Sequence, residues 1–84
     1  MKQKEMVISN KEGMRSKNAA YFIQVANKFN SLITIEKDNK RVNAKSIMGV
    51  LSLALTKGQT IIMTADGDDE AQAIKELEQV IKGE

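Results

Sequence analysis

Two residue types that carry much of protein chemistry are missing from this chain of 84 residues. The absence of cysteine excludes disulfides, thiolate zinc sites and cysteine nucleophiles. The absence of histidine removes the commonest general base, the commonest metal ligand and any phosphohistidine. We therefore expect a protein that is not an enzyme and needs no cofactor, and whose covalent chemistry is performed on it by other proteins.

Long apolar stretches are missing too. No run approaches the roughly 18 residues that span a bilayer, and residues 1–10 (MKQKEMVISN) lack the apolar core of a signal peptide. Hydrophobic residues make up 42% of the chain and charged residues 29%, close to ordinary globular usage. These features predict a single cytoplasmic domain over residues 1–84, without membrane contact and with a core too thin to enclose a deep substrate cavity.

Charge is distributed unevenly along the chain. Residues 1–45 carry ten Lys and Arg against four Asp and Glu, whereas residues 46–84 carry three against seven. This predicts a basic area of surface that attracts an acidic partner or a phosphate group. Direct nucleic-acid binding is the weaker alternative, because only Tyr21, Phe22 and Phe29 could stack on bases and the last two fall on a predicted core stripe.

The acidic run DGDDE at residues 66–70 invites a comparison with a calcium loop. An EF-hand loop needs Gly at its sixth position and Glu at its twelfth, where this chain has Ala71 and Leu77. A turn followed by acidic residues at a helix start explains the run better, and no metal site is predicted.

Hydrophobic periodicity predicts the element order β-α-β-β-α-β-α. Strands are expected around residues 5–9, over the hairpin pair 32–36 and 41–43, where Asn39 takes the positive φ of the turn, and over 60–65. Helices are expected from the cap Ser16 to Phe29, from the cap Ser46 to a stop at Gly58, and from a cap at Asp68 or Asp69 through Ile81. The predicted buried stripes are Ala19, Phe22, Ile23, Ala26 and Phe29 on the first helix and Ala71, Ile74, Leu77 and Ile81 on the last. This order predicts an α+β structure with one antiparallel sheet covered on one side by helices.

The second predicted helix is unusually apolar. Its apolar residues nearly encircle it, and they are Ile47, Met48, Val50, Leu51, Leu53, Ala54 and Leu55. Several must pack in the core, but some are expected to stay exposed as a candidate interaction site, and periodicity does not say which.

The segment VNAKSIMGVLSL at residues 42–53, followed by Gly67-x-Asp69-Glu70, resembles the HPr family of small phosphocarrier proteins of the bacterial sugar phosphotransferase system. The similarity runs from about residue 4 to residue 82. It implies the HPr-like open-faced β-sandwich, in which one four-stranded antiparallel sheet carries its helices on one face.

The loop before the first helix departs from that family. There the loop reads roughly G-[IL]-H-A-R-P-A, and the His carries the phosphoryl group; here residues 13–19 read GMRSKNA. Arg15 stands in place of the His, and a guanidinium stays protonated and offers no lone pair for phosphoryl transfer. We therefore expect no phosphohistidine transfer through residue 15.

Ser46 matches the regulatory serine of the family. By itself a serine at a helix start is most simply an N-cap. The resemblance implies more: phosphorylation of Ser46 by an ATP-dependent HPr kinase/phosphorylase, after which the protein acts as co-repressor of the LacI-type catabolite control repressor. It also implies that Ile47, Met48 and Leu51 face partners. Arg15 and Lys17 are either solvated charges or part of the site for the phosphate and the partner.

Two other functions remain open at this point. One is a phosphocarrier that uses a residue other than His, for which the loop offers Glu12 and Ser16. The other is a binding module that docks on a metabolic enzyme or a kinase without phosphorylation. The oligomeric state is open as well, either a monomer or a homodimer in which the first strand is exchanged through Glu12-Gly13.

Overall fold

The computed structural model describes residues 1–14 and 17–82. Its elements follow in the order β1 (Lys2–Val7), α1 (Lys17–Ala26), β2 (Leu32–Lys37), β3 (Lys40–Asn43), α2 (Ile47–Ser52), β4 (Thr60–Asp66) and α3 (Glu70–Ile81). The strands lie in the order β1-β4-β2-β3, and every neighbouring pair is antiparallel. The predicted element order and the four-stranded antiparallel sheet are thereby confirmed.

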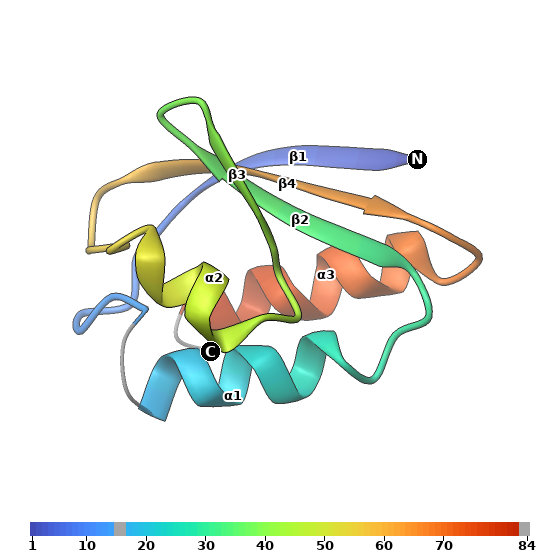
Figure 1. Cartoon of the computed structure of the whole chain (residues 1–84), viewed down its shortest axis with the longest axis horizontal. Coiled ribbons are helices and arrows are strands. Elements are labelled where there is room, and N and C mark those ends of the chain that lie inside the picture. The colour runs from blue at the N-terminus through green and yellow to red at the C-terminus, as the bar shows by residue number, and fades with distance from the viewer. Residues whose placement is uncertain (15–16, 83–84) are drawn as a thin grey trace.

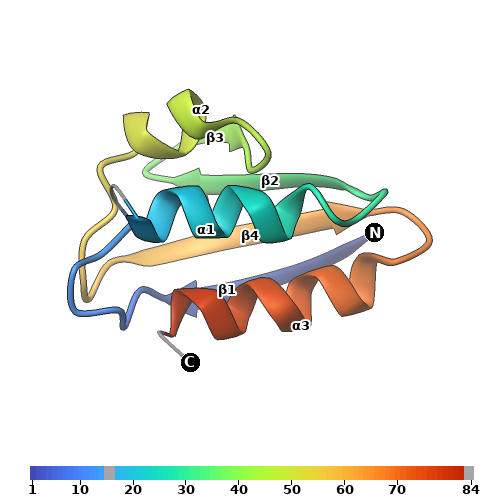
Figure 2. The same cartoon turned by 90° about the horizontal axis from the view of Figure 1, so that it is seen from below.

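The helices lie together on one side of the sheet (Figures 1 and 2). In Figure 2, which views the molecule from below, α1 and α3 lie in front of the long strands, and α2 lies beside the β2-β3 edge. The opposite face of the sheet carries no helix in the part of the chain that the structure describes. This is the open-faced α+β sandwich that the resemblance implied.

The core lies between the helices and the covered face of the sheet. Along β4, alternate residues Ile61, Met63 and Ala65 are buried, as the period of two in a strand requires. Phe22 of α1 and Leu77 of α3 pack against them and are fully buried. The side chains of the two layers therefore fill the space between them, and α2 contributes Val50 to the same core.

The first strand begins earlier than the alternation predicts. Its ladder with β4 runs from the pair Lys2↔Ala65 to the pair Val7↔Thr60. Lys4 reaches across to α3, where its Nζ lies 2.8 Å from Oε1 of Glu78. The start of β1 is formed by charged and polar residues, because backbone hydrogen bonds to β4, rather than side-chain burial, hold it in the sheet. Hydropathy therefore does not predict this part of the strand.

The β2-β3 hairpin forms as predicted. Asp38 and Asn39 are its two turn residues, and both have positive φ, 51° and 68°. Two consecutive residues with positive φ are the pattern of a type I′ turn, whose twist matches that of the flanking strands. The expectation for Asn39 is confirmed, and Asp38 shares the same conformation.

The second helix is shorter than predicted. Helix α2 ends at Ser52, and Ala54 has a φ of 49°, so the chain leaves the helix well before Gly58. Lys37 and Lys40 of the hairpin donate from Nζ to the carbonyl oxygens of Leu53 (2.9 Å) and Ser52 (3.4 Å). These two amino groups satisfy carbonyls at the helix end, where cations are favoured.

The other two helices also differ in detail from the prediction. Helix α1 ends at Ala26, so Phe29 is buried from the following segment rather than from the helix itself, while the predicted cap Ser16 lies outside the described residues. On α3, Ala71 is exposed and Ala73 takes its place in the core. The buried face of α3 is therefore rotated slightly from the predicted one. It consists of Ala73, Ile74, Leu77, Val80 and Ile81.

Asp69 precedes α3 as predicted, but its side chain does not cap the helix. Its carboxylate instead accepts hydrogen bonds from the hydroxyl and backbone N–H of Ser31 and from the backbone N–H of Asn30. The Ser31 hydroxyl is the main cause that holds the pKa of Asp69 below its ordinary value, and the backbone N–H groups add to it. This carboxylate therefore fastens the start of α3 to the segment that leads into β2.

Candidate functional site

Ser46 lies at the junction between β3 and α2. Its backbone is extended (φ −105°, ψ 117°), and its side-chain oxygen accepts a hydrogen bond from the backbone N–H of Gly49 at 3.1 Å. Its carbonyl oxygen accepts the N–H of Val50 at 3.0 Å. Ser46 is thus the N-cap of α2, as predicted, and its side chain is only half-buried.

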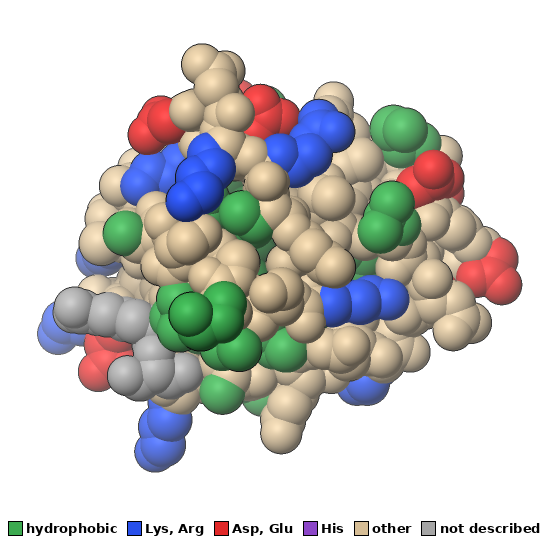
Figure 3. Space-filling view, in the orientation of Figure 1, with side chains coloured by type: hydrophobic (Ala, Val, Ile, Leu, Met, Phe, Trp, Pro, Cys, Tyr) green, Lys and Arg blue, Asp and Glu red, His purple; other side chains and the backbone are tan. Residues whose placement is uncertain are grey.

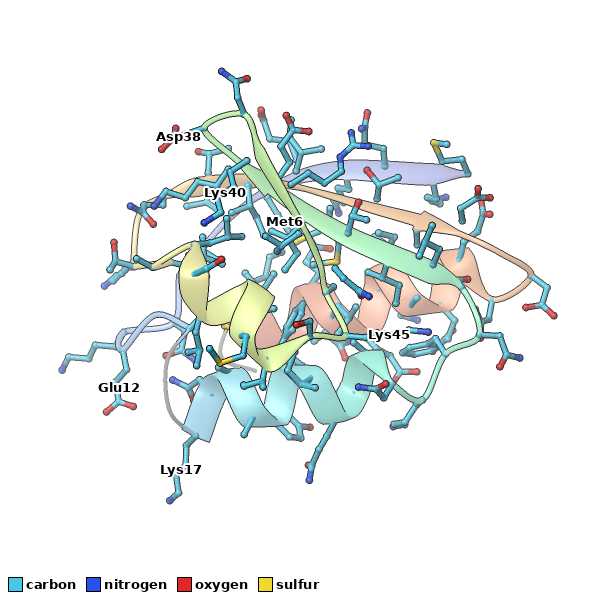
Figure 4. All side chains as sticks on the ribbon, viewed as in Figure 1. Met6, Glu12, Lys17, Asp38, Lys40 and Lys45 are labelled. Atoms are coloured by element: carbon cyan, nitrogen blue, oxygen red, sulfur yellow. The ribbon has the colours of Figure 1, made fainter. Side chains whose placement is uncertain are left out.

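The turn that presents Ser46 is held by Asn43 and Lys45. Asn43 accepts the N–H of Lys45 at its side-chain oxygen (2.8 Å) and the N–H of Ser46 at its backbone oxygen (3.1 Å). The Nζ of Lys45, labelled in Figure 4, donates to the carbonyl oxygen of Phe29 at 2.7 Å. These bonds fix the backbone on the N-terminal side of Ser46.

Gly49 lets α2 lie close to β3. A Cβ at this position would come within 3.3 Å of Cβ of Val42 and 3.4 Å of Cβ of Ser46. Both distances are tight or at the limit of ordinary contact, so a larger residue would push the helix away from the strand. The missing side chain of Gly49 thus lets α2, which Ser46 caps, pack closely against β3.

Three apolar side chains next to Ser46 are exposed. Ile47 is 39% exposed, Met48 75% and Leu51 40%, while Val50, Leu53 and Leu55 are buried. We call Ile47, Met48 and Leu51 the apolar patch. In Figure 3 hydrophobic side chains gather on the surface over α2. The structure thus separates the seven apolar residues of this segment into three that pack in the core and four that are exposed, namely the apolar patch and Ala54.

The loop where the family carries its histidine is only partly described. Arg15 and Ser16 lie outside the described residues. On the N-terminal side, Met14 is buried and its N–H donates to the carbonyl oxygen of Leu55 at 3.1 Å, which ties this loop to the segment after α2. On the other side, Lys17 begins α1, and in Figure 4 its exposed side chain points away from α2. The structure does not bring Lys17 to Ser46.

Asn18 holds the loop that precedes α1, a role that the sequence pattern does not predict. Its side-chain amide donates to Oδ1 of Asn10 at 3.3 Å and to the carbonyl oxygen of Gly13 at 3.1 Å. The family motif has Pro here, which can make neither bond. Its residue type could have indicated this role, because asparagine is favoured near a helix start, where its side chain forms local hydrogen bonds. Its effect is to close the 10–13 turn onto the start of α1.

None of the helices formed by the described residues has the length and apolarity that crossing a bilayer requires. Those residues also bring together no group of three or more acidic side chains that could hold a metal ion. The features that stand out are therefore the capping serine and the apolar patch beside it.

Comparisons with known proteins cover nearly the whole chain. The family described as the PTS HPr component phosphorylation site matches residues 2–83. The HPr-like protein Crh of Halalkalibacterium halodurans is 48% identical over 77 residues, which make up 92% of each chain. The chain is thus similar both to a curated Crh and to the wider family.

The chain is also similar to solved structures of HPr and Crh. A crystal structure of HPr-C-His from Thermoanaerobacter tengcongensis has a TM-score of 0.91 and 48% identity, covering 100% of this chain and 98% of that one. Crh of Bacillus subtilis, whose crystal structure is described as a swapped, intertwined dimer, has a TM-score of 0.79 and 41% identity, covering 99% and 95%. The resemblance predicted from the sequence is confirmed: this chain belongs to the HPr family, and it is similar to that family's Crh proteins, as its retained serine and missing histidine suit.

Proposed function

We propose that this chain is a cytoplasmic regulatory protein without catalytic activity of its own, which an ATP-dependent HPr kinase/phosphorylase phosphorylates on Ser46. The phosphorylated form then binds the LacI-type catabolite control repressor as its co-repressor. The observation that carries the proposal is the half-buried hydroxyl of Ser46 beside three exposed apolar side chains, in a chain with no histidine.

Phosphorylation would change this surface more than it changes the fold. A phosphoserine adds about −1.5 to −2 charge and three acceptor oxygens, enough for one to three charge-assisted hydrogen bonds with a basic partner. The apolar patch supplies contact area, because Ile47, Met48 and Leu51 already lie in solvent. The charge then acts as the switch and the patch as the constant part of the interface.

The decisive experiment is intact-mass measurement after incubation with purified HPr kinase/phosphorylase and ATP. We expect a gain of one phosphoryl group that maps to Ser46 and is absent from Ser46→Ala. Ser52→Ala is the matched control, because Ser52 is an exposed serine of the same helix. A chain that stays unmodified, or that carries the group elsewhere, contradicts the proposal.

The second step is tested by the affinity of the purified repressor for each form. We expect the phosphorylated chain to bind at least about tenfold tighter than the unmodified chain, since each charge-assisted bond to phosphate contributes on the order of 1.5–3 kcal/mol. Met48→Ala and Leu51→Ala should weaken binding of the phosphorylated form, because they remove apolar contact area.

One observation favours a second candidate, a binding module that works without phosphorylation. The apolar patch offers contact area without help from Ser46, because Ile47, Met48 and Leu51 lie in solvent while Val50 of the same helix packs in the core. A partner that binds wild type and Ser46→Ala equally tightly, and that binds no better after phosphorylation, would select this function over the first.

The proposed assembly is a monomer that can convert to a homodimer by exchange of β1. The likeness to the swapped dimer of Bacillus subtilis Crh supports this proposal. The turn that follows the strand is closed by the bond from the N–H of Gly13 to the carbonyl oxygen of Asn10 (3.0 Å) and by the side chains of Asn10 and Asn18. Size-exclusion chromatography with light scattering distinguishes the two states. Asn10→Ala should raise the dimer fraction, because it removes side-chain bonds that close the turn.

A further inference from the structure

The methionines of this chain fall into two groups by exposure. Met1 and Met48 are 79% and 75% exposed, whereas Met6, Met14 and Met63 are 4%, 2% and 0% exposed. Peroxides oxidise thioethers that they can reach, and the chain has no cysteine that would react first. Oxidant should therefore modify Met1 and Met48 and spare the core.

We propose that Met48 is an oxidation site through which a peroxide weakens the apolar patch as the surface on which the kinase docks to reach Ser46, a regulation that rests on the proposed phosphorylation of Ser46. The thioether sulfur gives an electron pair to one oxygen of hydrogen peroxide. An S–O bond forms, the O–O bond breaks, and the second oxygen leaves as water after taking up a proton. The thioether is oxidised to the sulfoxide, and the peroxide is reduced.

The position of Met48 separates its effect on binding from its effect on folding. Its side chain is three-quarters in solvent, so the sulfoxide oxygen can be hydrated without disturbing the buried Val50 on the same helix. When a partner covers Ile47 and Leu51, the sulfoxide must lose that water. A polar oxygen buried without a hydrogen-bond partner opposes binding, whereas the unmodified thioether favours it.

Met1 provides an internal comparison. It is as exposed as Met48, but the N-terminus lies away from α2 in both Figures 1 and 2, and its ammonium group pairs with Glu70 at 3.1 Å. Oxidation of Met1 should therefore leave the surface around Ser46 unchanged. A loss of function that follows the oxidation of Met48 rather than Met1 assigns the effect to the patch.

The experiment oxidises the purified chain with hydrogen peroxide and removes the peroxide with catalase before HPr kinase/phosphorylase and ATP are added. Peptide mapping should find one added oxygen on Met1 and Met48 well before Met6, Met14 or Met63. The rate of Ser46 phosphorylation should fall roughly tenfold or more, as expected for an unsatisfied polar group at an interface. Methionine sulfoxide reductases supplied with a thiol reductant should restore the rate.

Met48→Leu is the matched variant, because it keeps an apolar side chain that peroxide does not oxidise. Whatever its own rate, the ratio of treated to untreated rates should stay near one, although Met1 is still oxidised. Thermal unfolding of the treated wild type should match that of the untreated chain.

The outcomes separate the two proposals. If the untreated chain is not phosphorylated, the proposed function fails and the regulation fails with it. If the untreated chain is phosphorylated, the inference alone is overturned by any of three results: Met48 oxidised no faster than the buried methionines, no change of rate after oxidation, or the same loss of rate in Met48→Leu.

Discussion

The backbone N–H of Gly49 donates to the side-chain oxygen of Ser46 at 3.1 Å, so the serine proposed as the phosphorylation site also holds the first turn of α2. The same helix presents the apolar patch. Any change at the Ser46 oxygen therefore acts on the element that carries the neighbouring contact surface. This coupling requires that the capping contribution of Ser46 be measured separately from its role as a phosphate acceptor.

Ser46→Ala should lower the free energy of unfolding by about 1 kcal/mol, because alanine cannot accept the N–H of Gly49. Ser46→Asp should stay close to wild type, since aspartate is an equally good N-cap. Urea denaturation followed by circular dichroism measures both. Ser52→Ala is the control: the Ser52 hydroxyl is exposed and donates to the carbonyl oxygen of Gly49 at 2.6 Å. Such a back-bond within a helix adds little stability, so the expected change is less than about 0.5 kcal/mol. Equal stability of Ser46→Ala and Ser46→Asp would show that the cap contributes nothing.

Ala54→Gly should raise the free energy of unfolding by about 1 kcal/mol. Ala54 has a φ of 49°, a left-handed conformation that costs an alanine about 1–2 kcal/mol and a glycine little. The exposed Ala20→Gly within α1 is the control, and it should lower stability by about 0.5–1 kcal/mol. A destabilised Ala54→Gly would mean that the strain is absent in solution.

Much of the fold could be predicted because periodicity and turn chemistry agree with the tertiary structure. The β2-β3 hairpin and the buried alternation of β4 follow from local residues alone. The end of α2 could not be predicted, because Ala54 adopts a conformation that its residue type disfavours. Lys37 and Lys40 support that end from the hairpin, and such a contact is invisible in a local pattern.

The candidate site was predictable to a similar extent. The cap Ser46 follows from its position before an apolar run, and its capping bond is confirmed. Which apolar residues of α2 face solvent depends on how the helix lies against the sheet, so periodicity could not separate Met48 from Val50. For Lys17 the sequence leaves two roles open, a solvated charge or part of the phosphate site, and the second stays a prediction.

The pH dependence of stability should carry a contribution from Asp69. Hydrogen bonds from Ser31 and Asn30 hold its pKa below the ordinary value in the folded chain. Because the folded pKa is depressed, this contribution is present above the ordinary aspartate pKa of about 4 and is lost as pH falls through the folded value. Urea denaturation between neutral and strongly acidic pH measures it.

The matched pair for this prediction is Asp69→Asn and Asp68→Asn. Asp69→Asn should be less stable than wild type at neutral pH, with the difference shrinking in acid, because the wild-type carboxylate is then protonated as well. Asp68 is the neighbouring residue and is exposed, so the stability of Asp68→Asn should follow the pH dependence of the wild type more closely. Identical pH profiles for the two variants would show that Asp69 does not contribute to the pH dependence of stability.

Gly13→Ala should destabilise the chain more than Gly58→Ala does. Both glycines have positive φ, 70° and 93°, so each substitution costs about 1–2 kcal/mol in backbone strain. A Cβ on Gly13 would also lie 2.5 Å from the carbonyl oxygen of Leu55, whereas a Cβ on Gly58 would meet nothing within 4 Å. The clash adds about 1–3 kcal/mol, as overpacking does elsewhere. Thermal or urea unfolding of the two variants gives the difference directly, and equal losses would show that the 10–13 turn does not press against Leu55 in solution.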